Sequence, residues 1–309
     1  MTDRPWVRPA PGDPRWGHAE GLQIGLAPLP GPRGLIRVYT PYLGHPHGRM
    51  VNYVAVEPIP AGTSERGFSE LETSALDGEP GKRFWGADDP AEPEGPGDGV
   101  EDVAGGARRL SVYVMCERFD NGAEVYVRAR FDERRPHEVA LAAFAAPGSV
   151  PLSRVVLTAT MGNWARLRRL RLRERVVTPG ELWPGLADGL TGDARFGEGF
   201  AAHARFGLDD LVRDAAGAVL VTAEPDEADP SAAEYAPGTK EHWHFEGRPA
   251  AQTWRVEDPG PGLEAWVNGR YTYWASRSPI PGGVAYENVE VVRPFEQGQE
   301  AVFAVEPLA

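Results

Sequence analysis

Two glutamates stand two positions apart in the segment FSELET at 68–73. If this segment is a strand, Glu70 and Glu72 share one face and lie about 7 Å apart, from a rise of about 3.3 Å per residue. That separation falls between the carboxyl spacings of retaining and inverting glycosidases. In an apolar pocket one of the two would keep its proton while the other ionises. Glu70 and Glu72 are therefore candidate catalytic acid and base, and the alternative is a solvated strand face.

A second group has the residue types that remove a proton next to a carboxylate. Asn52 and Arg277 can neutralise a uronate carboxylate, which lowers the pKa of the adjacent carbon acid. Tyr271 and His45 are types that act as the base. Asn52 falls on the apolar face of the strand expected at 50–57, so the alternative is a buried hydrogen-bonding residue. For the histidine, the alternative is a surface loop.

Aromatic and charged residues nearby extend these two groups to substrate binding. On a strand at 271–275, Tyr271 and Tyr273 share a face with Arg277, as in a platform for a sugar or in ordinary cross-strand packing. The candidate substrate-binding residues are Arg277, His45, Arg49, Tyr273, Trp274 and Glu287.

Metal-ligand patterns are sparse. His45-Pro46-His47 and His242-Trp243-His244 have the spacing H-x-H, but neither has a carboxylate or cysteine at a usual ligand distance. We expect no cofactor and no metal site. A Ca²⁺ or other divalent ion bound by loop carboxylates such as Asp88 and Asp89 stays open.

Six arginines stand within ten residues in RLRRLRLRER at 166–175. Arginine makes bidentate contacts with carboxylates and phosphates, so the run fits an anionic polysaccharide or a phosphorylated ligand. The alternative is an outward strand face that pairs with acidic neighbours.

Composition favours an all-β protein. The 309 residues include 37 Gly and 30 Pro, which interrupt helices and suit strands joined by tight turns. Alternation over 109–131 around Asp120-Asn121-Gly122 predicts a hairpin, and Asn268-Gly269 predicts a turn between two further strands. One or two short peripheral helices are expected, the first at 207–216 and a candidate second at 226–235. About fifteen strand candidates predict one large antiparallel β-sandwich, a jelly roll or a supersandwich.

The domain reading is simple. We expect an N-terminal arm at 1–20 and one sandwich domain at 21–309, interrupted by a mobile acidic loop at 86–106. The net charge of −13 argues against nucleic-acid binding, and no apolar run is long enough to span a membrane. One cysteine, Cys116, and an N-terminus without an apolar signal region favour the cytoplasm. The oligomeric state stays open.

Three short segments resemble known carbohydrate-active sandwiches. The segment GGVAYENVEVV at 282–292 is similar to the closing strands of concanavalin-like lectin and glucanase jelly rolls. Ser69-Glu70-Leu71 resembles part of a strand in jelly-roll alginate lyases, with Phe68 and Glu72 at the flanking positions. The segment GLIRVYTPYLG at 34–44 and the chain length resemble galactose-mutarotase-like supersandwiches.

These resemblances imply a carbohydrate ligand. The expected function is a polysaccharide lyase or a glycoside hydrolase that acts on a glycan or glycoside, with an anionic substrate left open. The alternatives are a non-catalytic carbohydrate-binding protein and a structural or assembly β protein.

Overall fold

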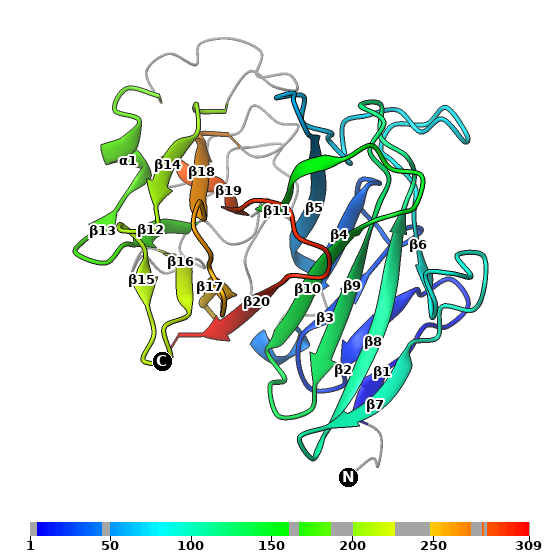
Figure 1. The fold of residues 1–309 in the computed structure, drawn as a ribbon. Coiled ribbons are helices and arrows are strands. Elements are labelled where there is room, and N and C mark those ends of the chain that lie inside the picture. Colours follow the sequence, from blue (N-terminus) through cyan, green and yellow to red (C-terminus); the bar gives the residue numbers. More distant parts are fainter. Residues whose placement is uncertain are drawn as a thin grey trace, which may run out of the picture.

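The computed structural model describes residues 5–44, 50–160, 167–186, 200–225, 248–272, 280 and 283–308. In these ranges regular structure is almost entirely β, and the strands form two large antiparallel sheets packed against each other (Figure 1). The predicted antiparallel β-sandwich is therefore confirmed. The short helices within the described residues are α1 (Pro179–Leu182) and a 3₁₀ turn at Pro41–Leu43.

Nine strands make up the first sheet within the described part of the chain. In spatial order they are β1 (Trp6–Val7), β2 (Arg15–His18), β3 (Gln23–Gly25), β4 (Leu35–Tyr39), β5 (Met50–Pro60), β11 (Leu152–Thr160), β19 (Ala285–Val292), β18 (Glu264–Arg270) and β14 (Ala204–Gly207).

Eleven described strands make up the second sheet. Its spatial order is β13 (Val176–Val177), β12 (Leu167–Arg171), β16 (Val219–Pro225), β17 (Ala250–Val256), β20 (Glu300–Pro307), β10 (Glu138–Ala145), β9 (Val125–Asp132), β8 (Ala107–Cys116) and β6 (Phe84–Ala87). The other two of the eleven strands pair beside this path: β15 (Val212–Arg213) pairs with β16, and β7 (Val100–Ala104) pairs with β8.

The sheets extend across the whole molecule. Figure 1 shows β8, β9 and β10 side by side in the right half of the view and β14, β18 and β19 in the left half, with β5 and β11 between them. The core between the sheets takes buried apolar side chains from both. Trp254 of β17 also donates an indole hydrogen bond of 3.0 Å to the carbonyl of Val289 in β19, which joins the two layers.

The alternation expected at 109–131 is realised as the hairpin of β8 and β9. In β9 the residues Val125, Val127, Ala129 and Phe131 are buried and the residues between them are half-buried. Gly122 has φ of +83°, the left-handed conformation that the turn requires and that glycine adopts at little cost. Here local pattern and tertiary structure agree.

Two boundary predictions need correction. Part of the expected N-terminal arm belongs to the first sheet, because β1 and β2 extend its edge and bury Trp6 and Trp16. The expected loop at 86–106 contains the end of β6 and all of β7. Its backbone is also held from outside, since the indole of Trp16 donates to the carbonyl of Gly97 over 2.8 Å.

Three element predictions were wrong. Asn268-Gly269 lies inside β18, where the pairing with β19 shifts by one residue, and it forms no hairpin turn. The segment 68–73 forms turns instead of a strand, and the expected helix at 207–216 is a turn region containing β15. The pairing of β18 with β19 overrode the Asn-Gly signal, and the pairing of β15 with β16 overrode the helix signal. The second expected helix, at 226–235, lies outside the described residues.

The connection between β5 and β6 lies against the first sheet and positions part of the candidate site. The amide of Gly67 donates to the carbonyl of Pro58 over 2.9 Å, and the hydroxyl of Ser69 accepts from the amide of Val56 over 3.2 Å. Gly34, with φ of +71°, lies beneath the same segment. A Cβ at this glycine would stand 1.8 Å from the carbonyl oxygen of Ser69, so the close approach requires glycine.

We expect Gly34→Ala to destabilise the protein by about 2 kcal/mol or more, because it adds steric overlap with Ser69 to the strain of a left-handed alanine. Gly62→Ala is the matched control, since Gly62 has φ of +80° and nothing within 4 Å of the added carbon. Urea unfolding would measure both variants. Equal losses would show that the contact with Ser69 contributes nothing.

Candidate functional site

Charged side chains gather on the outer face of the first sheet. In β5, β11 and β19 the residues Val56, Leu157 and Val289 point into the core. Their neighbours Glu57, Thr158 and Glu290 therefore point to the opposite face, because side chains alternate along a strand. These three are nonetheless buried, with exposed fractions of 6%, 1% and 0%. We call Glu57, Arg66, Glu70, Thr158, His203, Arg270, Glu287 and Glu290 the outer-face cluster.

Arg66 connects the strands within this cluster. Its guanidinium makes two hydrogen bonds to Glu290, of 2.8 and 3.1 Å, and also binds Glu57. The same group donates to the hydroxyl of Thr158 over 2.8 Å, and that hydroxyl donates in turn to Glu57. A guanidinium with several planar donors suits two carboxylates in this way.

The pKa values of the two carboxylates that share Arg66 shift in opposite directions. Burial and the charge of Glu290 raise the pKa of Glu57, although Arg66 and Thr158 offset part of the effect. Burial also opposes ionisation of Glu290, but hydrogen bonds from His203 and Arg66 hold its pKa below the usual value. Carboxyl groups separated in this manner can divide the roles of acid and base.

Glu70 lies at the border of the cluster and is half-buried. Burial raises the pKa of its carboxyl group to about 7, and the charges of Glu287 and Glu57 act in the same direction, while Arg270 acts against them. A carboxyl group that titrates near neutral pH in partial contact with solvent has the properties of a proton donor or acceptor.

Arg270 and Glu287 form a buried ion pair at 3.3 Å beside Glu70. Burial lowers the pKa of Arg270 and raises the pKa of Glu287, and each partner reduces the shift of the other. Glu287 is the residue at which the register of β18 and β19 shifts, so the strand irregularity brings an extra side chain to the cluster.

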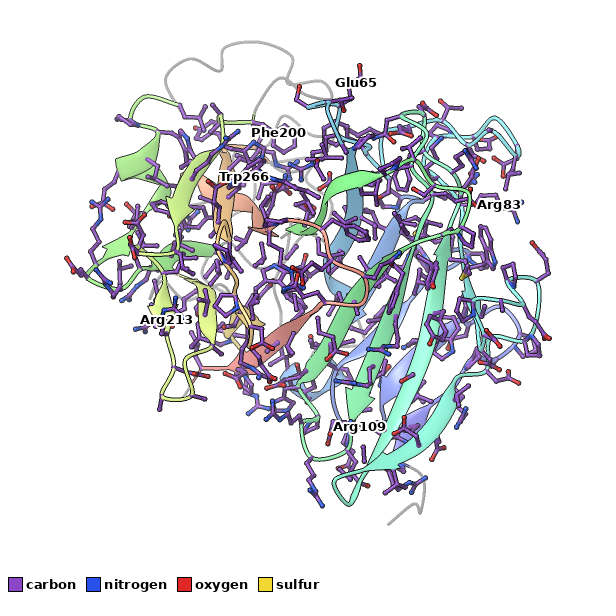
Figure 2. All side chains as sticks on the ribbon, in the orientation of Figure 1. Glu65, Arg83, Arg109, Phe200, Arg213 and Trp266 are labelled. Atoms are coloured by element: carbon purple, nitrogen blue, oxygen red, sulfur yellow. The ribbon has the colours of Figure 1, made fainter. Side chains whose placement is uncertain are left out.

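His203 adds a group on the other side of the cluster. Its Nε2 lies 3.2 Å from Oε1 of Glu290, and its side chain is 31% exposed. Its ring also lies 6.1 Å from that of Trp266, measured between centroids. A histidine oriented by a buried carboxylate is a common arrangement for a base. Figure 2 shows Trp266 and Phe200 in the same part of the molecule.

The predicted carboxylate pair is not realised. Only Glu70 belongs to the cluster. The carboxylate of Glu72 accepts from the amides of Phe68 and Asp120 and lies 3.3 Å from the buried amine of Lys82. Because 68–73 is a turn region, the two side chains do not share a strand face, and Glu72 fastens this segment to the turn at 120.

Asn52 is likewise separated from Glu70. It lies on the core face of β5, opposite to Glu57, and is fully buried. Its amide donates to the side-chain oxygen of Gln252 in the second sheet. The alternative of a buried hydrogen-bonding residue therefore describes Asn52, and the structure gives it no place in the outer-face cluster.

The remaining predicted residues divide into two groups. Tyr271 is half-buried and directly follows Arg270 in the chain, and Glu287 belongs to the cluster. Five other predicted residues lie outside the described residues: His45, Arg49, Tyr273, Trp274 and Arg277. The two H-x-H motifs lie outside them as well. The arginine run is a strand over its part Leu167–Arg171, as expected, and Arg171 pairs with Glu224 at 2.7 Å.

Sequence reasoning missed Glu57, Arg66, His203, Arg270 and Glu290. A signal existed for two of them, because Glu57 and Glu290 interrupt otherwise apolar strands. Such an acid is expensive to bury without a partner. The other three carry no local signal, since their importance arises from contacts with distant strands.

Within the described ranges, no three His, Cys, Asp or Glu side chains are grouped so as to hold a metal ion. Asp88 and Asp89 each accept a hydrogen bond from a backbone amide nearby, at 2.6 and 2.8 Å. Among the residues that the structure describes, no helix has the length and apolar character needed to cross a membrane.

Comparison with protein-family models, with curated proteins and with solved structures finds no match for this chain.

The raised pKa of Glu70 predicts a pH dependence of stability. Its folded pKa of about 7 exceeds the unfolded value, so its contribution to stability is complete below about pH 4 and is lost as pH rises through 7. We expect Glu70→Gln to gain stability relative to the unchanged protein between pH 5 and pH 8, by about 1 to 3 kcal/mol. Urea unfolding at both values measures this difference. Glu65→Gln, which removes an exposed carboxylate from the same segment, is the control. Parallel curves for Glu70→Gln and the unchanged protein would contradict the assignment.

Removal of Arg66 tests the ion pairs. We expect Arg66→Ala to cost about 3 to 5 kcal/mol, because Glu57 and Glu290 would remain buried without their cation. Adding Glu57→Gln should recover part of the loss, since one buried charge disappears. Arg83→Ala, at an exposed arginine, is the control. Thermal unfolding would measure the stability of each variant. A loss in Arg66→Ala no larger than that in Arg83→Ala would contradict the prediction.

Proposed function

We propose that this protein is a carbohydrate-active enzyme, a glycoside hydrolase or a polysaccharide lyase, in which Glu70 donates a proton to the departing sugar oxygen. The observation that carries the proposal is the pKa of about 7 at a half-buried glutamate surrounded by buried charges. Such a group is protonated often enough at neutral pH to act as an acid and ionises readily afterwards. Both glycoside hydrolysis and elimination need a proton at the leaving oxygen.

The surroundings of Glu70 support a sugar as the ligand. Phe68 and Leu71 lie on the same turn and are 39% and 58% exposed, so two large apolar side chains are accessible to a ligand beside Glu70. Sugars present apolar C–H faces that pack on such side chains. An apolar surface next to an acid that titrates near pH 7 is the combination expected at a sugar-cleaving site.

The second group in the reaction depends on the bond that is broken. In an elimination, His203 is the base, because Glu290 orients its ring through Nε2 and its side chain reaches solvent. In a hydrolysis, Glu287 is the second carboxylate, because it lies near enough to Glu70 to raise its pKa. The role of Glu70 is common to both reactions.

Two observations favour the other functions. Arg66, Glu57 and Glu290 are joined by mutual ion pairs, which is favourable for a rigid binding surface without turnover. Val100 and Val103 are 49% and 70% exposed on β7 at the border of the second sheet, which suits an assembly protein. Neither observation explains why the pKa of Glu70 is raised to about 7.

Replacing Glu70 with glutamine should lower turnover by about 10² to 10⁴-fold and leave substrate affinity within a few-fold, because the amide keeps the shape and loses the proton. A panel of neutral and uronic-acid polysaccharides and glycosides would be incubated with each variant. Ultraviolet absorbance of unsaturated uronates reports a lyase, and new reducing ends without that absorbance report a hydrolase. Glu65→Gln is again the matched control.

Equal turnover in Glu70→Gln and Glu65→Gln would remove Glu70 from the chemistry. Retention on a glycan column without any turnover would favour a binding protein. Absence of both, together with a concentration-dependent oligomer, would favour an assembly protein.

A further inference from the structure

Trp266 carries two arginines on the outer face of the first sheet. The guanidinium carbon of Arg205 lies 4.0 Å from the centroid of the indole ring, and that of Arg154 lies 5.8 Å from it. The indole is 8% exposed and is fixed by a hydrogen bond of 2.7 Å from its nitrogen to Glu264. Arg205 and Trp266 are direct partners across β14 and β18. The indole is thus in close contact with the guanidinium of Arg205 and lies within 6 Å of that of Arg154.

The donors of these two arginines are not used within the described part of the chain. There, neither side chain has an ion pair or hydrogen bond to a protein group, and the ring contact of each is with the indole of Trp266. Stacking on an aromatic ring uses the flat face of a guanidinium and leaves its N–H groups directed outward in the plane. Arg205 is exposed and Arg154 is half-buried, so an anion from solvent can reach them.

Several other arginines of the described residues are paired with acids. Acidic residues outnumber basic ones by 45 to 32, so partners are abundant. Arg128 and Arg130, for example, share Glu300 at 3.0 and 2.6 Å. Two neighbouring arginines without such a partner concentrate positive charge on an otherwise acidic protein.

The position of this pair relates it to the outer-face cluster. Trp266 lies next to His203, whose ring is bound to Glu290. Glu290 and Trp266 are direct cross-strand partners of β19 and β18. An anion held by the two arginines would therefore lie on the same sheet face as the candidate base and its carboxylate.

We propose that Arg205, which stacks on Trp266, and Arg154 beside the same ring form a subsite for the carboxylate of an acidic sugar. This inference rests on the proposed function and specifies its substrate class as uronic-acid glycans. Guanidinium groups bind carboxylates with two parallel N–H···O bonds, and the ring beneath them holds the donors in place before the ligand arrives. A uronate carboxylate in this position places the sugar beside His203.

The test uses the full chain and isothermal titration calorimetry with oligosaccharides of glucuronic acid, with glucose oligosaccharides of the same length and with inorganic sulfate. Arg154→Gln and Arg205→Gln each remove one charge and its donors. Arg213→Gln is the matched control, since Arg213 lies on β15 well apart from Trp266 (Figure 2). Circular dichroism would confirm that each variant is folded.

We expect each of the two substitutions to weaken glucuronate binding about tenfold or more, because a charge-assisted hydrogen bond is lost. The double variant should bind the acidic and the neutral oligosaccharide equally weakly. The control should retain the affinity of the unchanged protein. Binding of the uronate should also weaken steeply with added salt.

Three results would overturn the inference. These are equal affinity of the unchanged protein for acidic and neutral oligosaccharides, equal losses in Arg205→Gln and Arg213→Gln, and sulfate binding as tight as that of the uronate. None of them touches the role of Glu70, which is judged by turnover in Glu70→Gln. Conversely, selective uronate binding without turnover would support the subsite and refute the enzyme.

Discussion

Burying Glu57 and Glu290 on one face of a sheet costs several kcal/mol per ion unless a cation is held between them. Arg66 supplies that cation from the connection that follows β5. The hydroxyl of Thr158 accepts a hydrogen bond from Arg66 and donates one to Glu57. The contact joins β5, β11 and β19 through their side chains, in addition to the backbone ladder. It also holds the 61–72 segment over the sheet, and this segment carries Glu70. The position and the environment of Glu70 therefore depend on the pairing of Arg66.

Within the cluster, differences in contact shift the pKa values of chemically identical carboxyl groups in different directions. Glu290 receives hydrogen bonds from Arg66 and His203 and stays ionised, while Glu57 and Glu70 hold their protons more strongly. Buried carboxylates that lie near one another cannot all ionise at the same pH. The least buried of the three, Glu70, is the one that can exchange a proton with a bound molecule.

The fold was predictable where alternation continued over many residues. The hairpin of β8 and β9 and the long strand β5 followed from period-two patterns and a glycine turn, and most glycine-rich connections are turns. Short signals failed. Asn268-Gly269 is a hairpin signal only if the next residues turn back, and here β18 continues through it because β19 offers partners. In the same way the pattern of GLDDLVRDAA at 207–216 suited a helix, but pairing with β16 drew part of it into a strand.

The sequence by itself determined the class of fold, the faces of the longest strands and the presence of acids within apolar strands. These properties follow from side-chain alternation and from the conformations of glycine and proline, which act within a few residues. Only the tertiary structure decided which acids share a site. Glu70 lies near Glu287, which is more than two hundred positions away in the sequence. Glu72 instead pairs with Lys82, and Asn52 donates a hydrogen bond to Gln252 in the other sheet. Electrostatic partners are set by distances between strands that lie far apart in the sequence, and no local pattern encodes those distances.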